Sequence, residues 1–312
     1  MTHTADTITT VLPLEGLRVG ISGAVPEREY WGGVPDLDRL ILTFVAQLSA
    51  LVVRFGGAVV HGSQPLLAPV VAEQARRQTR EGRKSLKLFA SQLFGDLPEV
   101  TRRAARLADA DVVLTRQVGR GDSRDRQTRN DSLTAMRLAM TQQIDVLVAV
   151  GGKLHVETGF NPGVLEELAH ARWHDVPCFA VAAFGGAAGK LEQPILEEVS
   201  AGNLLGTDTT LSVVDLATWS DTMDEYVGKM LAHLARHKER FSKIGPQKFG
   251  PQILTSLIQR DDVSKTSSVG FSLADVNPKA VGAWSARFAR LMRAVDRKDI
   301  DGARKLLSTK DF

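Results

Sequence analysis

Residues 145–167 read DVLVAVGGKLHVETGFNPGVLEE, which is the pattern of a buried strand, a glycine turn and the start of a helix. The apolar run VLVAV is typical of a strand that is buried on both faces. Gly151 and Gly152 end this run, and glycine there permits a positive φ or the close approach of a ligand. A helix is expected after the Asn-Pro-Gly turn, with Glu166 and Glu167 in its first turn. Free N–H groups and the helix dipole favour an anion at such a helix start, so the pattern predicts a binding site, although ordinary turns share it.

The composition is that of a folded protein with a sizeable core and no pronounced charge. Of the 312 residues, 43% are hydrophobic and 24% are charged, and the formal net charge of +3 gives no argument for nucleic-acid binding. Cys178 is the single cysteine, so a disulfide framework is excluded and a reducing compartment is expected. The N-terminus lacks the pattern of a signal peptide, and no apolar run approaches the roughly 20 residues of a membrane helix. We therefore expect a soluble, cytoplasmic protein with no membrane partner.

Apolar strand patterns alternate with amphipathic helix patterns along most of the chain. The expected strands are 17–22, 58–61, 86–90, 111–115, 146–150, 178–182 and 211–214. The expected helices are 36–55, 66–81, 99–108, 131–143, 163–174, 191–199 and 221–241. This alternation predicts an α/β fold with a mostly parallel sheet and helices on both faces. Ligands of such sheets bind outside the carboxyl ends of the strands.

The pattern changes near residue 242. Two Gly-Pro steps within 242–252 are typical of a linker, and the residues from 261 to 276 are polar and weakly patterned. Two amphipathic helices are expected at 278–294 and 299–307. We therefore divide the chain into a ligand-binding domain, 1–241, and a linker with a C-terminal helical extension, 242–312. The extension is expected to pack on the domain or to self-associate, with binding of another partner as the alternative.

The candidate ligand-binding residues are glycines, polar side chains and charges placed next to strands. They are Ser22, Gly23, Gly56, Gly57, His61, Gly62, Pro65, Arg137, Gly151, Gly152, Lys153, Gly163, Glu166 and Glu167. The glycine pairs and Arg137 are expected to hold a phosphate, the two glutamates to accept ribose hydroxyls, and His61 to flank the ligand. Simple turns are the alternative for each glycine group. The arginine-rich loop 116–129 is interleaved with acids and is expected to be a solvated, self-paired loop.

Several well-known kinds of site are not indicated by the sequence. His170 and His174 have a spacing that suits a metal, but no HExxH pattern or third ligand accompanies them, so no metal site is predicted. There is no G-x-G-x-x-G after the first strand and no P-loop. Neither Ser22 nor Ser63 lies in a nucleophile elbow. We predict no cofactor.

Three segments resemble the SLOG superfamily over about residues 17–241. They are Ile21-Ser22-Gly23, the run FGGAVVHGSQP at 55–65, and VAVGG at 148–152 followed by PGVLEELAHA at 162–171. The superfamily unites the "lonely guy" phosphoribohydrolases, the DNA-processing DprA proteins and nucleotide sensors of bacterial conflict systems. The resemblance implies a Rossmann-like domain, a homo-oligomer of two or more copies, and a nucleotide site at a P-G-G-x-G-T-x-x-E motif. Its glutamate, which acts in cleaving an N-glycosidic bond, corresponds to Glu167.

The sequence departs from the enzymes of this family in three ways. The loop 153–162 separates the two halves of the motif, Val164 stands at the threonine position, and Met136 stands where the enzymes carry an arginine. These departures favour the sensor branches, which implies a ligand such as a nucleoside phosphate or an ADP-ribose-like molecule in a bacterial defence or stress pathway. The alternative is an N-glycosyl hydrolase that uses Glu167, Glu166 and Arg137. A third reading, a DprA-like DNA-binding assembly protein, is disfavoured by the modest charge.

Overall fold

The computed structural model describes residues 12–80, 82–155, 159–174, 176–190, 271–297 and 299–308. Within these ranges, seven parallel strands form one sheet in the order β6-β5-β1-β2-β3-β4-β7. The strands are β1 (Arg18–Ala24), β2 (Ala58–His61), β3 (Leu86–Ser91), β4 (Asp111–Thr115), β5 (Val146–Gly151), β6 (Cys178–Val181) and β7 (Phe271–Ala274). The predicted α/β fold with a mostly parallel, Rossmann-like sheet is confirmed.

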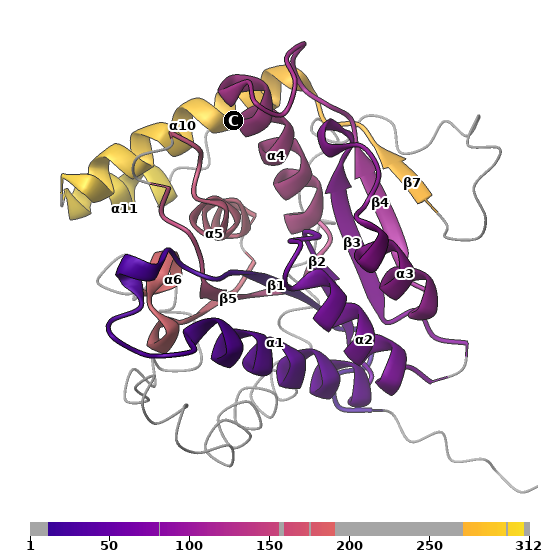
Figure 1. Cartoon of the computed structure of the whole chain (residues 1–312). Coiled ribbons are helices and arrows are strands. Elements are labelled where there is room, and N and C mark those ends of the chain that lie inside the picture. The colour runs from indigo at the N-terminus through magenta and orange to yellow at the C-terminus, as the bar shows by residue number, and fades with distance from the viewer. Residues whose placement is uncertain are drawn as a thin grey trace, which may run out of the picture.

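Helices cover both faces of this sheet (Figure 1). One layer contains α1 (Leu37–Arg54), α2 (Ala68–Gln78) and α3 (Glu99–Leu107). The opposite layer contains α4 (Arg126–Thr141), α5 (Gly163–Trp173), α10 (Pro278–Asp296) and α11 (Ile300–Ser308). Shorter pieces are the 3-10 turns η1 (Arg28–Tyr30), η2 (Gln92–Phe94) and η3 (Ala182–Phe184), and the helix α6 (Gly186–Lys190). Helices on both faces explain why β5 is apolar at every position, because neither of its faces meets water.

The two cores are separated by the alternation of side chains along each strand. On β1, Val19 and Ile21 join the core under α1 and α2, whereas Gly20 faces Ile144 and Leu147 in the core under α4 and α5. Since successive strand residues point to opposite faces, Ser22 also faces the α4 and α5 layer. This parity decides which of the predicted site residues can meet.

The strand order has its switch point at the carboxyl ends of β1 and β5, and this position is called the crevice below. The chain leaves β1 toward α1 on one face and leaves β5 toward α5 on the other face. β1 and β5 are nevertheless neighbours in the sheet, paired from Val19 with Val146 to Ala24 with Gly151. Connections that diverge between adjacent parallel strands leave a crevice, which is where open α/β sheets bind ligands.

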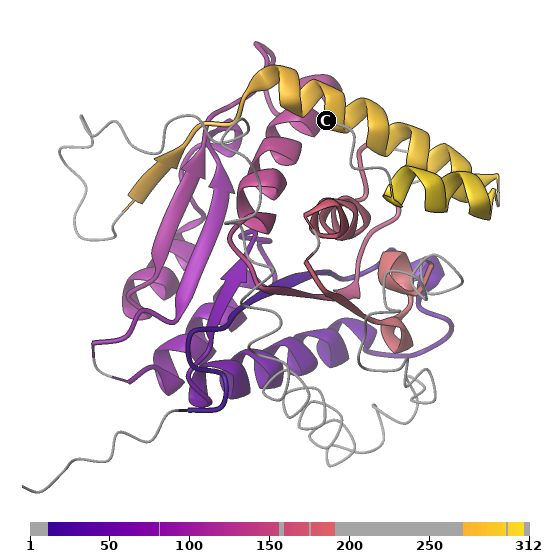
Figure 2. The same ribbon diagram turned by 180° about the vertical axis from the view of Figure 1, so that it is seen from behind.

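The C-terminal residues complete both the sheet and one helix layer. β7 lies parallel beside β4, although the sequence between 261 and 276 predicts no strand. The two predicted helices correspond to α10 and α11, and Figures 1 and 2 show α10 crossing the outer side of α4. Trp284 and Phe288 of α10 are buried in the core shared with α4 and α5.

Helix α4 begins at Arg126 rather than at Asp131 as predicted. The side chain of Asp125 accepts a hydrogen bond from the backbone N–H of Thr128 at 2.8 Å, which is the geometry of an N-cap. Arg126 and Arg129 therefore belong to the first turn of a helix and not to the expected arginine-rich loop.

Some predictions fall outside the described residues. They are the helix 191–199, the strand 211–214, the helix 221–241 and the linker that follows residue 242. In the part of the chain that is described, no helix is long and apolar enough to cross a membrane.

Candidate functional site

Helices α4 and α5 bring one arginine and two glutamates together below the carboxyl edge of the sheet. Arg137 lies on α4, and Glu166 and Glu167 lie on the first turns of α5. All three are buried, because α5 packs against the sheet, α4, α6 and α11 and has no face in water. The sequence predicted that these residues form one site, and the structure brings them together.

Glu166 is fully buried and its carboxylate is held from three sides. The guanidinium of Arg137 donates to one oxygen, the hydroxyl of Thr134 donates to the other, and Nε2 of His170 lies 3.7 Å from the carboxylate. Burial raises the pKa of Glu166, but the charge of Arg137, the nearby ring of His170 and the hydrogen bond from Thr134 outweigh it and lower the pKa to about 2. Glu166 is thus a permanently charged partner that holds Arg137 in place, and neither oxygen is left for a ligand.

The pKa of Glu167 is shifted in the opposite direction from that of Glu166. Its carboxylate lies 3.7 Å from Nε of Arg137, and one oxygen lies beside Gly62, where a Cβ would be 3.6 Å away. Burial raises the pKa of Glu167 to about 7, against the charge of Arg137 and the nearby Ser22 hydroxyl, with Glu166 adding to the rise. At neutral pH this carboxyl exchanges between its protonated and ionised forms, which suits a group that contacts a ligand or transfers a proton.

Two buried polar atoms next to Glu167 have no hydrogen-bond partner. They are the hydroxyl of Ser22 and Nε of Arg137. The Ser22 hydroxyl is close enough to influence the pKa of Glu167, yet the two groups do not form a hydrogen bond of ordinary geometry. An unsatisfied buried polar group costs about 1–3 kcal/mol. Such groups facing one crevice are expected where a ligand supplies the missing partner.

The start of α5 presents further donors. The N–H groups of Gly163, Val164 and Leu165 lie at the N-terminus of α5, which is the positive end of the helix dipole. None of them donates a hydrogen bond to an acceptor among the described residues. Gly163 lies against the guanidinium of Arg137, because a Cβ there would be 2.6 Å from Nη2. The missing side chain at Gly163 therefore lets the arginine lie directly beside the helix start, and the two together favour an anion.

The glycine pair Gly151-Gly152 has a role that differs from the predicted phosphate cradle. The N–H of Gly152 donates to the carbonyl of Ala24 at 2.7 Å, and its carbonyl accepts from Ala187 at 3.0 Å. Both glycines have positive φ, and a Cβ at position 152 would be 2.6 Å from Val164. The pair thus permits a tight turn and the close packing of α5, while the N–H of Gly152 is already used inside the protein.

Other predicted residues do not reach this site. Gly56 and Gly57 precede β2 and lie at the amino edge of the sheet, so they cannot share a phosphate with Gly151 and Gly152. The expectation that both glycine pairs lie at one edge of the sheet is therefore wrong. Gly56 and Gly57 follow helix α1, whereas Gly151 and Gly152 lie at the end of strand β5. Gly23 faces Leu67 in the α1 and α2 layer, and Pro65 lies in the exposed turn before α2. Lys153 lies exposed in the loop that follows β5, above the crevice.

His61 is also placed on the other face. It pairs in register with Ile21, and both belong to the face covered by α1 and α2, whereas Gly62 faces Glu167. Its Nδ1 bonds to the carbonyl of Ile21 at 2.8 Å, so Nδ1 must carry the hydrogen. Burial lowers the pKa of His61, and the ring is therefore neutral. His61 and Glu167 therefore lie on opposite faces of the sheet, contrary to the expectation that both flank one ligand.

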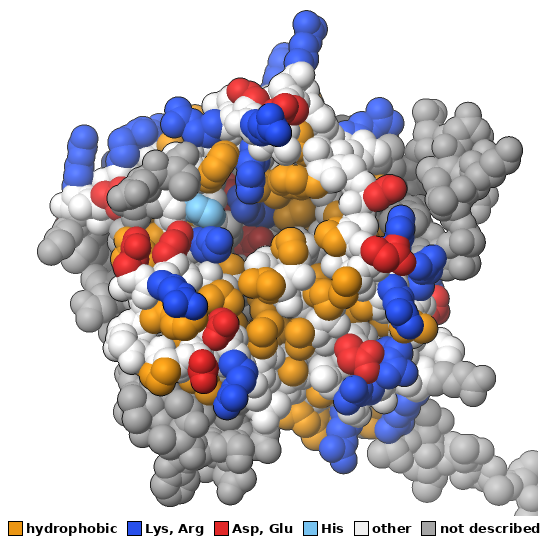
Figure 3. All heavy atoms as spheres, viewed as in Figure 1, with side chains coloured by type: hydrophobic (Ala, Val, Ile, Leu, Met, Phe, Trp, Pro, Cys, Tyr) orange, Lys and Arg blue, Asp and Glu red, His pale blue; other side chains and the backbone are white. Residues whose placement is uncertain are grey.

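Several residues at the carboxyl edge were not predicted. Thr134 and His170 hold Glu166, Glu27 bonds to the loop after β5, and Arg129 stacks on Phe160 at 4.4 Å from the ring centre. Thr134 and His170 lie one turn from Arg137 and Glu166, so their spacing along each helix is the sequence signal that points to them. Figure 3, which has the same view as Figure 1, shows basic side chains and a histidine around a hollow in the upper half of the molecule.

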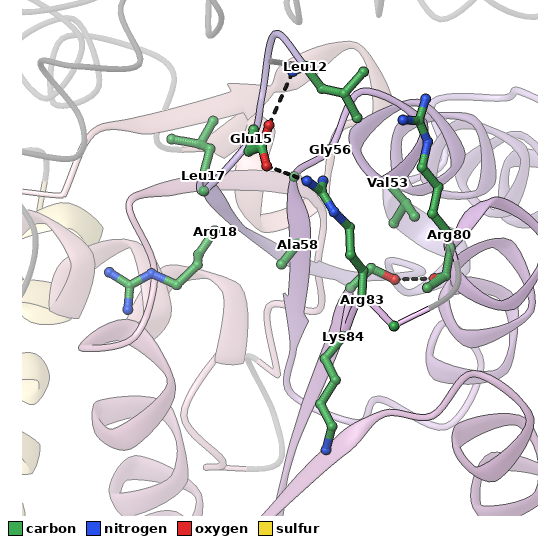
Figure 4. Close-up of a pocket in the computed structure, with 15 residues that line it drawn as sticks. Leu12, Glu15, Leu17, Arg18, Val53, Gly56, Ala58, Arg80, Arg83 and Lys84 are labelled. Atoms are coloured by element: carbon green, nitrogen blue, oxygen red, sulfur yellow. Dashed lines mark hydrogen bonds and ion pairs between the residues drawn. The ribbon is translucent and has the colours of Figure 1, made fainter. Parts of the chain in front are cut away.

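A separate cavity of about 430 Å³ lies at the opposite, amino edge of the sheet. Figure 4 shows Arg83 reaching to Glu15 within it, while Arg18 and Lys84 point away. Arg18 pairs with Asp145 at 2.7 Å, and Lys84 pairs with Asp111 at 2.7 Å. Three of the four cations that line the cavity are thus paired with carboxylates, Arg80 being the fourth, and no buried polar atom in the cavity lacks a partner among the described residues. The carboxyl edge is therefore the stronger candidate.

Metal-binding groups of three or more His, Cys, Asp or Glu do not occur in the described ranges.

Fold and site together define a Rossmann-like α/β protein with a buried charged cluster where its strand connections diverge. Comparison with protein families identifies it further, because residues 97–244 match the family described as SLOG cluster2. The matched region includes Arg137, Glu166 and Glu167, so this part of the chain is similar to SLOG proteins where the charged cluster lies. No curated protein matches the chain.

Proposed function

We propose that the crevice at the carboxyl ends of β1 and β5 binds a nucleotide-derived ligand, either a nucleoside phosphate or an ADP-ribose-like molecule. The observation that carries this proposal is Glu167, a buried carboxyl with a pKa near 7 that lies beside the partnerless atoms of Ser22 and Arg137. The match of residues 97–244 to the SLOG cluster2 family is consistent with a nucleotide-related role.

The chemistry of the site assigns each part of the ligand to a place. A phosphate group binds at the start of α5, where unoccupied N–H groups lie beside the guanidinium of Arg137. The ribose hydroxyls donate to Glu167 and bond to the hydroxyl of Ser22. Glu166 makes no contact with the ligand and instead fixes the position of Arg137.

The role that fits these features is that of a sensor in a bacterial defence or stress pathway. Binding requires only the donors and the carboxyl described above. The resemblance to the sensor branches, with Val164 and Met136 in place of residues that the hydrolases carry, supports binding over turnover. We further propose that the protein acts as a homo-oligomer in the cytoplasm.

One observation favours hydrolysis of an N-glycosidic bond as the second candidate. A carboxyl with a pKa of about 7 is suited to act as an acid or a base at neutral pH, and carboxylates stabilise the positive charge that develops as a glycosidic bond breaks. In that reaction Glu167 acts on the sugar, while Arg137 holds the phosphate.

A titration with product analysis separates the two candidates. AMP, ADP, NAD and ADP-ribose are each titrated calorimetrically into the full chain, and release of free base is followed by chromatography. Glu167→Gln removes the ionisable carboxyl, and we expect it to weaken binding about 10- to 100-fold, because a hydrogen bond to a charged group is lost. Glu99→Gln is the control, since Glu99 is an exposed carboxyl on α3.

The outcomes are distinct. Binding that depends on Glu167 without release of base supports the sensor. Release of base by the wild type and not by Glu167→Gln supports the hydrolase. If none of the four compounds binds to the wild type, or if both variants bind equally well, the proposed site is wrong.

A further inference from the structure

Glu27 joins the two sides of the crevice. It follows β1, yet its carboxylate accepts hydrogen bonds from the backbone N–H groups of Leu154 and His155 in the loop after β5, both at 3.1 Å. These are the two connections that diverge to opposite faces of the sheet. The carboxylate therefore lies across the place where the fold leaves room for a ligand.

The two N–H groups form a concave donor pair. Both N–H groups point at one carboxylate, that of Glu27, at 3.1 Å each. Paired backbone donors of this kind bind anions such as phosphate. The carboxylate of Glu27 is an anion of the same chemistry, and it occupies the donor pair from within the protein.

Cations surround the same point. Burial lowers the pKa of His155, and the charges of Lys153, Arg137 and Arg129 lower it further, against Glu27, so these groups are all near its ring. Arg129 lies over the rings of Phe160 and Phe94, at 4.4 Å and 5.5 Å, and its Nε has no hydrogen-bond partner. No carboxylate among the described residues pairs with Arg129. Arg137 is already paired with Glu166, so the positive charge that Glu27 leaves only partly neutralised is that of Lys153 and Arg129.

We propose that the N–H groups of Leu154 and His155 are a second anion subsite of the crevice, and that Glu27 closes it until a phosphate group of the ligand displaces the carboxylate. The nucleotide part of this inference rests on the proposed function. The subsite favours ligands with two phosphate groups, one at the start of α5 and one at the donor pair. Displacement of Glu27 also releases the segment from β1 to α1.

The alternative is that Glu27 only fixes the loop. The same loop is bonded on its other side to Asn130, which accepts from the N–H of Asn161 at 3.1 Å and donates to the carbonyl of Gly159 at 3.3 Å. If Glu27 is a loop contact and nothing more, its removal loosens the loop and brings no gain in anion binding. The two readings therefore predict opposite changes in affinity.

Inorganic pyrophosphate is the probe, because it carries two phosphate groups and no nucleoside. Calorimetric titration compares the wild type, Glu27→Gln and Glu29→Gln in the full chain. Glu29 is an exposed carboxyl two residues away, so the control changes the net charge of the same segment equally. We expect Glu27→Gln to bind pyrophosphate about tenfold more tightly than the wild type, because the competing carboxylate is gone. Glu29→Gln should match the wild type. Equal or weaker binding by Glu27→Gln contradicts the subsite.

A second measurement uses the wild type alone and so does not depend on how the variant folds. Saturating pyrophosphate should shift the amide resonances of Leu154 and His155 in a nitrogen–proton correlation spectrum, and unshifted resonances contradict the subsite. Tight pyrophosphate binding by Glu27→Gln without binding of any nucleotide would contradict the proposed function and leave the subsite standing. Nucleotide binding that is the same in the wild type and in Glu27→Gln would contradict the subsite alone.

Discussion

Glu166 and Glu167 are neighbours in the sequence and share one arginine, yet their carboxyl groups differ in charge at neutral pH. Glu166 accepts from Arg137 and Thr134 and keeps its charge, with a pKa of about 2. Glu167 lies 3.7 Å from the same arginine, and burial raises its pKa to about 7. One guanidinium satisfies one buried carboxylate, so the second carboxyl is the group that remains available to a ligand.

This difference has a measurable effect on stability. Because the folded-state pKa of Glu167 is above its ordinary value of 4.5, its contribution to stability is complete below pH 4.5 and is lost as the pH rises through about 7. The substitution Glu167→Gln puts a neutral side chain at this position, so the variant does not lose stability as the pH rises through 7. We expect the variant to match the wild type near pH 4.5 and to be more stable at pH 8, by up to roughly 3 kcal/mol.

Urea unfolding of both proteins from pH 4.5 to 8 measures this effect. The difference between the two proteins is the relevant quantity, since burial also lowers the pKa of His61 and His170 in both and makes an opposite contribution at low pH. A variant that is less stable than the wild type at pH 8, or a difference that does not change with pH, would contradict the assignment of Glu167.

Sequence patterns predicted the residues on α4 and α5 better than those on the strands. Arg137, Glu166 and Glu167 lie on long helices whose spacing is regular, and they meet as expected. The position of His61 depends on the parity of a short strand, and a shift of one residue moves a side chain to the other face. The role of Gly56 depends on whether a turn ends a helix or a strand, and local composition does not distinguish these.

At the scale of elements, the C-terminal helices are an integral layer of the fold. Trp284 of α10 is buried, with its ring centre 4.0 Å from Trp173 and 4.8 Å from His170 of α5. His170 in turn lies beside Glu166. The packing of α10 is therefore continuous with the charged cluster of the candidate site.

Truncation of this tryptophan tests the packing. Trp284→Ala removes a large buried side chain, and we expect it to lower the free energy of unfolding by about 3–5 kcal/mol. Arg290→Ala is the control, because Arg290 is exposed on the same helix and should change stability by no more than about 0.5 kcal/mol. Urea unfolding measures both. A small loss in Trp284→Ala would mean that α10 does not pack on α5.

Helices and strands also differ in how well the sequence predicts them. α10 and α11 have regular apolar stripes and were expected close to their observed bounds. β7 is a run of only four residues, FSLA, within the weakly patterned segment 261–276, and it is a strand because β4 offers it an edge to pair with. Such pairing is a long-range property that no local pattern contains.

At the scale of the whole molecule, alternating strands and helices predict the fold class but not the strand order. The order places β1 beside β5 and sends their connections to opposite faces. That arrangement brings Ser22, Glu27 and Glu167 to one crevice from distant parts of the sequence. The sequence therefore indicates that a site lies at the carboxyl edge, whereas its composition follows only from the order of the strands.

The central claim is that this crevice is the ligand site. A crystal structure of the full chain with ADP-ribose tests it most directly, because it locates the ligand relative to both edges of the sheet. We expect a ribose hydroxyl within hydrogen-bond distance of Glu167, about 3 Å, and a phosphate at the start of α5 beside Arg137. A ligand bound in the cavity at the amino edge, beside Arg80 and Arg83, would contradict the account.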